Sequence, residues 1–319
     1  MRTLPVLSLT ILLTCAGVAS AQDANITLPV PELEGMLGND PFTIVSAEIS
    51  RPKAKGDITL KAEVSFGGKP PIRLKLRKAE PGAESFNNVP RYDLAAYELQ
   101  KLFLDPPEYV VPPTSLRFVP LPEFQKYSSQ VKRTFTGADE VLCVLQYWLQ
   151  DVKVIADVYL PTLLATDSAY ARYVGQMNIL TFLIEHGDSN VGNFLISRAE
   201  VAPRVFSVDN GVAFAAGESD RGRLWADLRV DRLPADAVER LRRITPEALH
   251  ERLDVVAQWK LEDGRFVAAP RGPALSTNRG VRRDGETLQM GLTRVEIERL
   301  WTRLRRLLQM IDEGRVKTL

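Results

Sequence analysis

The residues with the clearest capacity for chemistry lie in one polar loop and in a short acidic segment that follows it. The loop reads HGDSNVGN over residues 186–193 and contains Asp188 and Asn193, and the acidic segment reads DNG and starts at Asp209. Phosphoryl transfer requires a carboxylate beside the acceptor hydroxyl and oxygen ligands for Mg²⁺, because its catalysis consists mainly of positioning and charge neutralisation. The pattern therefore predicts Asp188 as the catalytic carboxylate, and Asn193 and Asp209 as oxygen ligands of a hard metal ion.

The same residues are also compatible with structural roles. Asp188, Asn193 and the DNG segment have the residue types that form turns. His186 is expected to bond the backbone of its loop rather than to take part directly in a reaction. A zinc hydrolase is disfavoured, because no second His or Cys stands at ligand spacing from His186 and Asp188.

A cation for the phosphates of a nucleotide is expected from an earlier strand, IRLKLRK. Its alternation places Lys75 on one face together with Arg73 and Arg77, and Lys78 on the opposite face. Alternation therefore leaves both Lys75 and Lys78 open as the phosphate-binding residue. The helical pattern from Asp93 to Leu104, which comes next, is expected to supply an acid that braces this cation.

These side chains have to be positioned by a chain that is β-rich first and α-rich second. Alternating apolar residues predict strands over residues 43–46, 58–66 and 72–78, and a strongly apolar run predicts a further strand over 141–149. Gly67 and Gly68 are expected to form a hairpin turn between two of these strands. From residue 149 onward the composition predicts helices almost to the end, with a Gly- and Arg-rich loop over 270–285. The last helix is expected to start at a capping box of Thr293 and Glu296 and to stop at Gly314.

The order of these elements predicts an α+β fold with two lobes and a cleft between them. The N-terminal lobe, residues 22–148, is expected to contain an antiparallel sheet with one helix. The C-terminal lobe, residues 149–319, is expected to be mostly helical and to carry the catalytic and metal-binding motifs. Since the lobes are predicted to meet near residues 146–152, Gln146 is included among the candidate nucleotide-binding residues.

The overall composition is that of a globular chain. Its 319 residues include 41 Lys and Arg, 40 Asp and Glu, and 45% hydrophobic residues, so a core of ordinary size can stabilise the fold. A formal charge of +1 disfavours a nucleic-acid partner, because such proteins gain affinity by neutralising phosphates.

The first residues have the pattern of a cleaved secretory signal. Arg2 precedes an apolar stretch, and Ala19-Ser20-Ala21 provides small residues for a peptidase. We expect residues 1–21 to be removed, which leaves Cys143 as the one cysteine, inside an apolar run where it is expected to be core. The protein is therefore predicted to be secreted or periplasmic, with no stable membrane anchor after cleavage.

Four segments together resemble the protein-kinase-like superfamily: LKLR around Lys75, DLAAYEL from Asp93, HGDSNVGN and VDNG. The resemblance is to the divergent branch that includes phosphatidylinositol 3- and 4-kinases and secretory-pathway kinases. It implies a two-lobed kinase-like fold that uses ATP and Mg²⁺ to phosphorylate a hydroxyl of a protein, lipid or small molecule. It also implies these roles: Asp188 as catalytic aspartate, Asn193 and Asp209 as metal ligands, Lys75 as phosphate-pairing lysine, and Asp93 as the helix acid that pairs with it.

Two features depart from this family pattern. Asp93 is one methylene shorter than the usual glutamate, and Glu98 is the alternative acid on the same helix. No G-x-G-x-x-G motif is present, since Gly67-Gly68 is the one glycine pair before Lys75.

Other interpretations remain open. The HGD loop also looks like that of aminoglycoside and choline phosphotransferases, which act on small molecules. An alternative from another class is a catalytically inactive pseudokinase that serves as a nucleotide-binding or interaction module. For a phosphotransferase the partners are expected to be a nucleotide and a hydroxyl acceptor, and the protein is expected to be a monomer.

Overall fold

A computed structural model describes residues 24–50, 58–85, 89–214 and 222–319 of the protein. The predicted signal peptide, residues 1–21, lies outside the described residues. The described helices are α1 (Val30–Gly38), α2 (Pro90–Gln100), η1 (Pro106–Glu108), α3 (Leu121–Gln125), α4 (Pro161–Thr166), α5 (Ser168–Leu183), η2 (Val191–Asn193), η3 (Leu224–Ala226), α6 (Ala235–Arg242), α7 (Pro246–Leu253) and α8 (Arg294–Asp312).

The described strands belong to four sheets. They are β1 (Phe42–Ile49), β2 (Thr59–Phe66), β3 (Ile72–Lys78), β4 (Thr114–Pro120), β5 (Glu140–Tyr147), β6 (Val152–Val154), β7 (Phe194–Ser197), β8 (Val205–Ser207), β9 (Arg232–Leu233), β10 (Ala257–Glu262), β11 (Arg265–Ala268), β12 (Val281–Asp284), β13 (Thr287–Met290) and β14 (Lys317–Thr318). The α+β class expected from the sequence is confirmed.

The largest sheet described is antiparallel and has the strand order β1-β2-β3-β5-β4. The hairpin between β2 and β3 turns at Gly67 and Gly68, as predicted. Both glycines have positive φ, 54° and 78°, which is the conformation that a tight turn of this kind requires. The predicted strand at residues 141–149 is β5, which ends at Tyr147.

The two faces of this sheet pack against different helices. On β2 the even-numbered side chains from Leu60 to Phe66 are buried, and together with Cys143 they form a cluster that includes residues of α1 and α3. On the other face, residues of β4 and β5 such as Leu116 and Val144 belong to the larger cluster, which also contains α2 and α5. The expectation that Cys143 is core is confirmed.

The N-terminal part of the chain contains more helix than expected. Where one helix was predicted, the structure describes α1, α2 and α3 before residue 148. Helices α1 and α3 have nine and five residues, so each is too short to show several turns of apolar periodicity. Helix α2 was predicted from Asp93 to Leu104, but it begins at Pro90 and ends at Gln100.

The expectation that residues 149–319 are mostly helical is only partly met, because strands β6 to β14 all lie in this range. A four-stranded sheet of order β11-β10-β13-β12 occupies residues 257–290, where helices and a loop were expected. These strands have four to six residues and include charged side chains such as Arg283 and Asp284, so their period of two is weak in the sequence. Burial of Trp259, Leu288 and Met290 holds the sheet to the rest of the protein.

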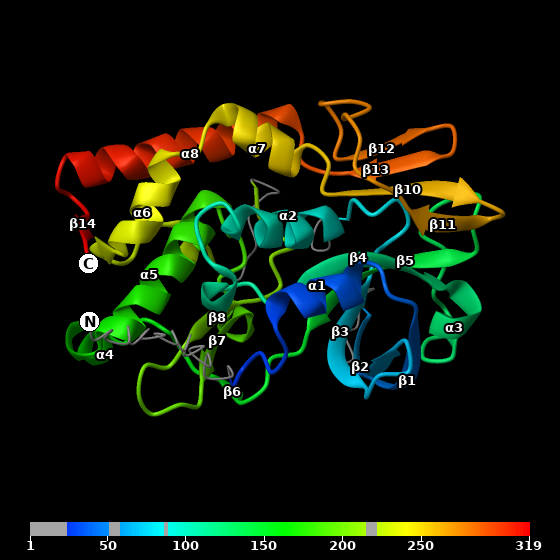
Figure 1. The fold of residues 1–319 in the computed structure, drawn as a ribbon, viewed down its shortest axis with the longest axis horizontal. Helices are drawn as coiled ribbons and strands as arrows, with labels where there is room; N and C mark the ends of the chain where they lie inside the picture. The colour runs from blue at the N-terminus through cyan, green and yellow to red at the C-terminus, as the bar shows by residue number, and fades with distance from the viewer. Residues whose placement is uncertain (1–23, 51–57, 86–88, 215–221) are drawn as a thin grey trace, which may run out of the picture.

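Helix α2 lies between the main sheet and the C-terminal elements, with α8 and α7 on its far side (Figure 1). All of its residues are buried. Helix α8 has the predicted capping box, in which Thr293 accepts the Glu296 N–H and Glu296 accepts the Thr293 N–H. The same Glu296 carboxylate pairs with Arg91 of α2 at 2.7 Å, so the start of α8 is tied to the start of α2.

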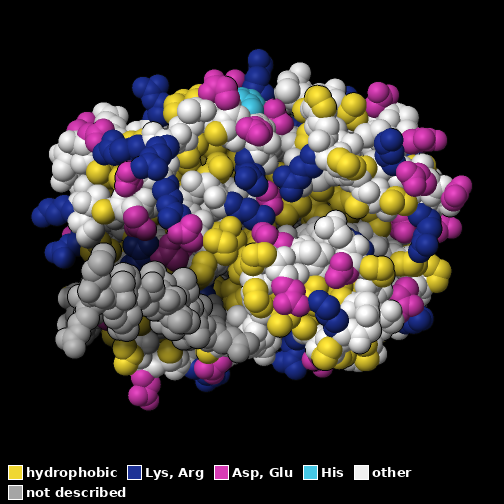
Figure 2. All heavy atoms as spheres, in the orientation of Figure 1, with side chains coloured by type: hydrophobic (Ala, Val, Ile, Leu, Met, Phe, Trp, Pro, Cys, Tyr) yellow, Lys and Arg dark blue, Asp and Glu magenta, His cyan; other side chains and the backbone are white. Residues whose placement is uncertain are grey.

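The surface has no single sign of charge. Figure 2 shows Lys and Arg side chains interspersed with Asp and Glu over the visible face. Among the described helices, none has the length and apolar composition needed to cross a membrane.

Candidate functional site

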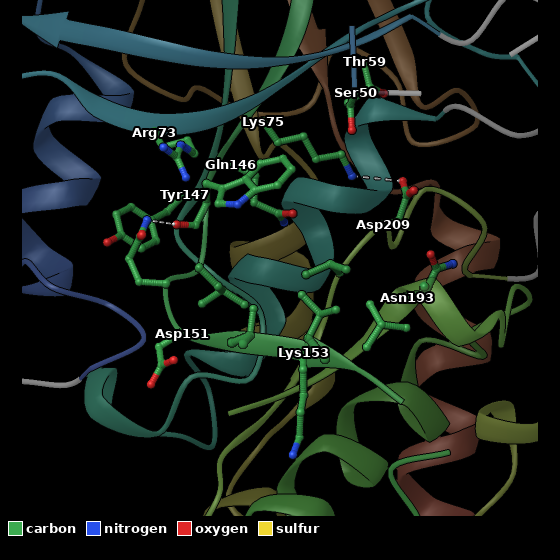
Figure 3. Close-up of a pocket in the computed structure, with 18 of the residues that line it drawn as sticks. Ser50, Thr59, Arg73, Lys75, Gln146, Tyr147, Asp151, Lys153, Asn193 and Asp209 are labelled. Carbon is green, nitrogen blue, oxygen red and sulfur yellow. Dashed lines mark hydrogen bonds and ion pairs between the residues drawn. The ribbon is translucent and has the colours of Figure 1, made fainter. Parts of the chain in front are cut away.

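A pocket of about 720 Å³ lies beside the middle of β3 and the end of β5. Four of the residues proposed from the sequence line it, namely Lys75, Gln146, Asn193 and Asp209. Figure 3 shows Lys75, Asp209 and Asn193 together at one end, with Tyr147 and Asp151 at the other. Residues from three separated segments of the chain therefore meet in one cavity.

The structure distinguishes between the two candidate lysines. Lys75 points into the pocket, where its Nζ lies 3.3 Å from Asp209 Oδ1 (Figure 3). Lys78 is buried and pairs with Glu80 at 2.5 Å. Because side chains alternate along β3, only one of these lysines can face the pocket, and the residue that does so is Lys75.

Asp209 is the acidic residue at the Lys75 end of the pocket, and it lies between two cations. Its Oδ1 accepts a hydrogen bond from Arg77 Nη1 in addition to its contact with Lys75. Its backbone has φ of 62°, in the left-handed region that aspartate tolerates better than most residues. This backbone turn directs the carboxylate toward β3.

Asp93 contacts a different cation from the one that the family resemblance implied. Arg77 Nη2, and not Lys75, donates to Asp93 Oδ2. Arginine is longer than lysine, and Arg77 lies further along the same face of β3, so it reaches the short carboxylate of Asp93. The Asn210 N–H donates to Asp93 as well. Burial raises the pKa of Asp93, and the Arg77 guanidinium opposes that shift.

Glu98, the alternative helix acid, faces another part of the molecule. It pairs with Lys101 at 2.7 Å, Arg252 at 3.0 Å and Arg271 at 3.4 Å. Burial by itself would raise the pKa of Glu98, but Lys101 and the two arginines bring it below its usual value. Asp93 is therefore the α2 acid that lies next to the pocket residues.

The predicted catalytic loop joins Asp188 to Asn193 by a hydrogen bond. Asn193 Nδ2 donates to the Asp188 carbonyl oxygen at 3.0 Å. Since the side-chain nitrogen of Asn193 makes this bond, its side-chain oxygen, Oδ1, is the atom available to a cation. Asp188 itself is 8% exposed and does not belong to the described lining of the pocket.

His186 has the structural role expected from the sequence. Its Nδ1 accepts the Asp188 N–H at 3.3 Å, so the proton of the neutral ring is on Nε2. The ring is fully buried and packs against Phe194. Burial lowers the pKa of His186 to about 4, which keeps the ring neutral at physiological pH. A neutral, buried histidine shapes the backbone of the loop and adds no charge to it.

The other end of the pocket is held by a residue that the sequence reasoning missed. Asn25 Nδ2 donates to the carbonyl oxygens of Gln150 and Asp151, at 2.9 and 3.2 Å, and Asn25 O accepts the Gln150 N–H at 3.0 Å. Asn25 is 2% exposed. Its position in a short polar stretch before α1 carries no sequence signal for this role, because the partners are backbone atoms far along the chain.

Gln146 and Trp148 lie along the β5 wall of the pocket. Gln146 is opposite Lys75 in the strand register, and its Nε2 donates to Thr114 Oγ1 at 3.0 Å. The Trp148 N–H donates to the Arg73 carbonyl oxygen at 3.0 Å, which extends the sheet bonding past the end of β5. Gln146 therefore lies in the predicted place, and Trp148 is an additional lining residue.

The glycine pair is not part of the pocket. Gly67 and Gly68 join β2 to β3, whereas the pocket is lined by Ser50 and Thr59, which flank the connection from β1 to β2. Residues 51–57 of that connection lie outside the described residues. The turn at Gly67 and Gly68 therefore lies outside the described lining of the pocket.

The pocket's donor set fits a hard cation that shares its ligands with a phosphate. Asp209 offers carboxylate oxygen and Asn193 an amide oxygen, which are the ligand types that Mg²⁺ prefers. In the described part of the chain, no three His, Cys, Asp or Glu side chains gather in a metal site. Lys75 and Arg77 beside Asp209 would repel a lone divalent ion, so a cation at this position would need a further anionic ligand.

Comparison with known proteins does not assign the chain to a family. No protein-family model matches it, and a search of curated proteins finds no match.

Proposed function

We propose that this protein is an exported, kinase-like phosphotransferase that moves the γ-phosphate of ATP to a hydroxyl group. The observation that supports the proposal is the meeting of Lys75, Asn193 and Asp209 in one pocket. A cation, an amide oxygen and a carboxylate are the side chains that binding a metal–polyphosphate complex requires.

Each residue has a distinct part in the proposed reaction. Lys75 would bind phosphate oxygens, and Asn193 and Asp209 would hold Mg²⁺. A metal held by these two residues would supply positive charge for the group that is transferred. Asp188 orients the acceptor hydroxyl and receives its proton. The hydrogen bond from Asn193 Nδ2 to the Asp188 carbonyl oxygen fixes the positions of these two residues relative to each other.

The proposal includes a two-lobed arrangement with its boundary near residues 148 and 149. The pocket wall from Tyr147 to Asp151 lies at that boundary. The base of the nucleotide is expected against this wall, beside Trp148. The phosphates would then extend toward Lys75 at the opposite end of the pocket.

The first test is nucleotide-dependent melting of the purified full chain. A ligand at a hundred times its Kd stabilises a protein by about 2.7 kcal/mol, so Mg·ATP is expected to raise the melting temperature measurably. The absence of any shift with Mg·ATP or other Mg-nucleotides would contradict the proposal.

The second test is transfer of labelled γ-phosphate. Asp188→Asn removes the proposed proton acceptor with little change in shape and is expected to abolish transfer while nucleotide binding remains. Asp139→Asn, at an exposed position, is the matched control. Equal transfer by the wild type and Asp188→Asn would remove Asp188 from its proposed role.

A nucleotide-binding module without catalysis is the second candidate. The observation that favours it is the position of Asp209, whose Oδ1 lies against both Arg77 and Lys75. If these contacts persist with ligand bound, ATP would bind without Mg²⁺ and no phosphate would be transferred. Melting with ATP in the presence of a chelator distinguishes the two candidates.

A further inference from the structure

Arg77 contacts two carboxylates, although it does not belong to the described lining of the pocket. Its side chain is only 4% exposed. One guanidinium nitrogen donates to Asp93 on α2, and the other donates to Asp209 in the pocket. Arginine is the side chain suited to this geometry, because its planar fork can hold two carboxylates at once.

The segment around Asp209 is built closely around this guanidinium. A Cβ on Gly211 would lie 2.8 Å from Arg77 Nη2 and 3.2 Å from Asp93 Oδ2, so a side chain at this position would displace the pair. Asn210 donates its N–H to Asp93, and its side-chain oxygen accepts from Ser207 Oγ at 2.8 Å. The DNG segment is thus fitted to the Arg77–Asp93 pair at each of its three residues.

Helix α2 holds Asp93 in a fixed place. Arg91 pairs with Glu296 at 2.7 Å and donates to the Gly291 carbonyl at 3.2 Å. At the other end of the helix, Gln100 donates to the Val111 carbonyl at 2.9 Å and accepts two backbone N–H groups. Because both ends of α2 are held, the position of Asp93 is set by the surrounding structure.

We propose that Arg77 is a positioning residue. It bonds both Asp93 of α2 and Asp209, and so holds Asp209 at a fixed place relative to α2, while Lys75 remains available for the nucleotide. The strand cation that pairs with the helix acid and the cation that binds phosphate are then two different residues. This inference rests on the proposed function for its catalytic consequence, but the coupling between Arg77 and Asp209 can be measured without any ligand.

The ligand-free test is a double-mutant cycle followed by urea unfolding. In the wild-type background, Asp209→Asn removes a carboxylate beside two cations and is expected to lower the unfolding midpoint. In the Arg77→Met background, Asp209 keeps Lys75 but lies near Asp93 without the guanidinium, so Asp209→Asn is expected to lower the midpoint much less than in the wild type. Equal shifts in both backgrounds would overturn the proposal.

The test with ligand separates positioning from phosphate binding. Arg77→Lys keeps the charge but loses the fork, and it is expected to lower kcat about tenfold or more and to raise the Mg²⁺ requirement, with KM for ATP nearly unchanged. Lys75→Met is expected to raise KM for ATP instead. If Arg77→Lys only lowers the melting temperature and leaves kcat and the Mg²⁺ requirement unchanged, Arg77 has a purely structural role.

A second variant covers the case in which the Arg77 variants fail to fold. Gly211→Ala displaces the guanidinium and removes no charge, so it is expected to reproduce the lower kcat and the higher Mg²⁺ requirement. Gly35→Ala is the control, because nothing lies within 4 Å of its added Cβ. Wild-type kinetics for Gly211→Ala would contradict the proposal.

If the wild type neither binds nor turns over ATP, the proposed function fails, and the ligand-free cycle still decides whether Arg77 positions Asp209.

Discussion

The two ends of the pocket are held by different kinds of interaction. At one end, Lys75 and Arg77 hold Asp209 by charge, and Arg77 also pairs with Asp93. At the other end, Asn25 holds the pocket wall by neutral hydrogen bonds to backbone atoms. Removing one partner of a buried ion pair leaves an unpaired buried charge and costs several kcal/mol of unfolding free energy. Removing a side chain that bonds backbone carbonyls costs only the free energy of those hydrogen bonds.

This difference suits the parts that we propose for each end. In the proposed function, the charged end would meet a metal and phosphates whose charges change during the reaction, and groups fixed in advance around Asp209 suit that task. The neutral end has to present a constant wall to the rest of the ligand. The predictions below test whether the two ends differ in this way.

The largest effect is expected for Asp209→Asn on phosphate transfer. Loss of a charged group that acts on the transferred phosphate costs about a hundredfold or more in rate, or about 3 kcal/mol. The measurement is the initial rate of label transfer from ATP, with Asp139→Asn as control. A rate within a few-fold of wild type would show that the charged end does not contribute to catalysis.

The next effect is on stability, for Asp93→Asn. This variant leaves the buried Arg77 without its α2 partner and is expected to cost about 3 kcal/mol of unfolding free energy. Glu98→Gln is the matched comparison on the same helix. Its partners Arg252 and Arg271 are 39% and 42% exposed, so water can replace the lost carboxylate. Its third partner, Lys101, keeps its ion pair with Glu34 at 2.6 Å, so a smaller loss is expected. Urea unfolding measures both variants, and equal losses would contradict the distinction.

At the neutral end, Asn25→Ala removes two part-buried side-chain hydrogen bonds to the backbone carbonyls of Gln150 and Asp151. The expected loss is about 2 kcal/mol of unfolding free energy, with weaker binding of Mg·ATP because the wall at Gln150 becomes looser. This loss should be the same at low and high salt, whereas the loss in Asp209→Asn should shrink as salt increases. If the loss of unfolding free energy depends on salt in the same way in both variants, the two ends of the pocket are held by the same kind of interaction.

A smaller effect concerns the pH dependence of stability through His186. In the unfolded chain its pKa is near 6.5, and in the folded protein burial lowers that pKa to about 4. As the pH falls below 6.5, the unfolded state takes up a proton that the folded state does not, so folding loses about 2 kcal/mol between pH 7 and pH 5. Urea unfolding at several pH values measures this loss.

The control for this prediction is a variant that removes the ring. His186→Phe should reduce the loss of stability between pH 7 and pH 5, although its overall stability is lower because the Asp188 N–H loses its acceptor. His250→Ala, at a partly exposed helix position, should leave nucleotide binding unchanged. An unchanged pH profile in His186→Phe would assign the acid sensitivity to other groups.

Features that depend on neighbouring residues were predictable from the sequence. The hairpin at Gly67 and Gly68, the capping box at Thr293 and Glu296, and the apolar run that contains Cys143 follow from local spacing. Alternation along β3 also placed Lys75 and Arg77 on one face, which was the available signal for the role of Arg77. The short helices and the sheet at residues 257–290 were missed because a few residues provide too little periodicity.

The sequence by itself determined the α+β class and the residue types of the candidate site, because hydrophobic period and motif spacing are properties of the chain. Only the tertiary structure decided between Lys75 and Lys78, paired Asp93 with Arg77, and brought Asn25 to the pocket wall. These choices depend on the reach of side chains between segments that are distant in sequence. Such distances are set by packing, and packing is a property of the folded molecule as a whole.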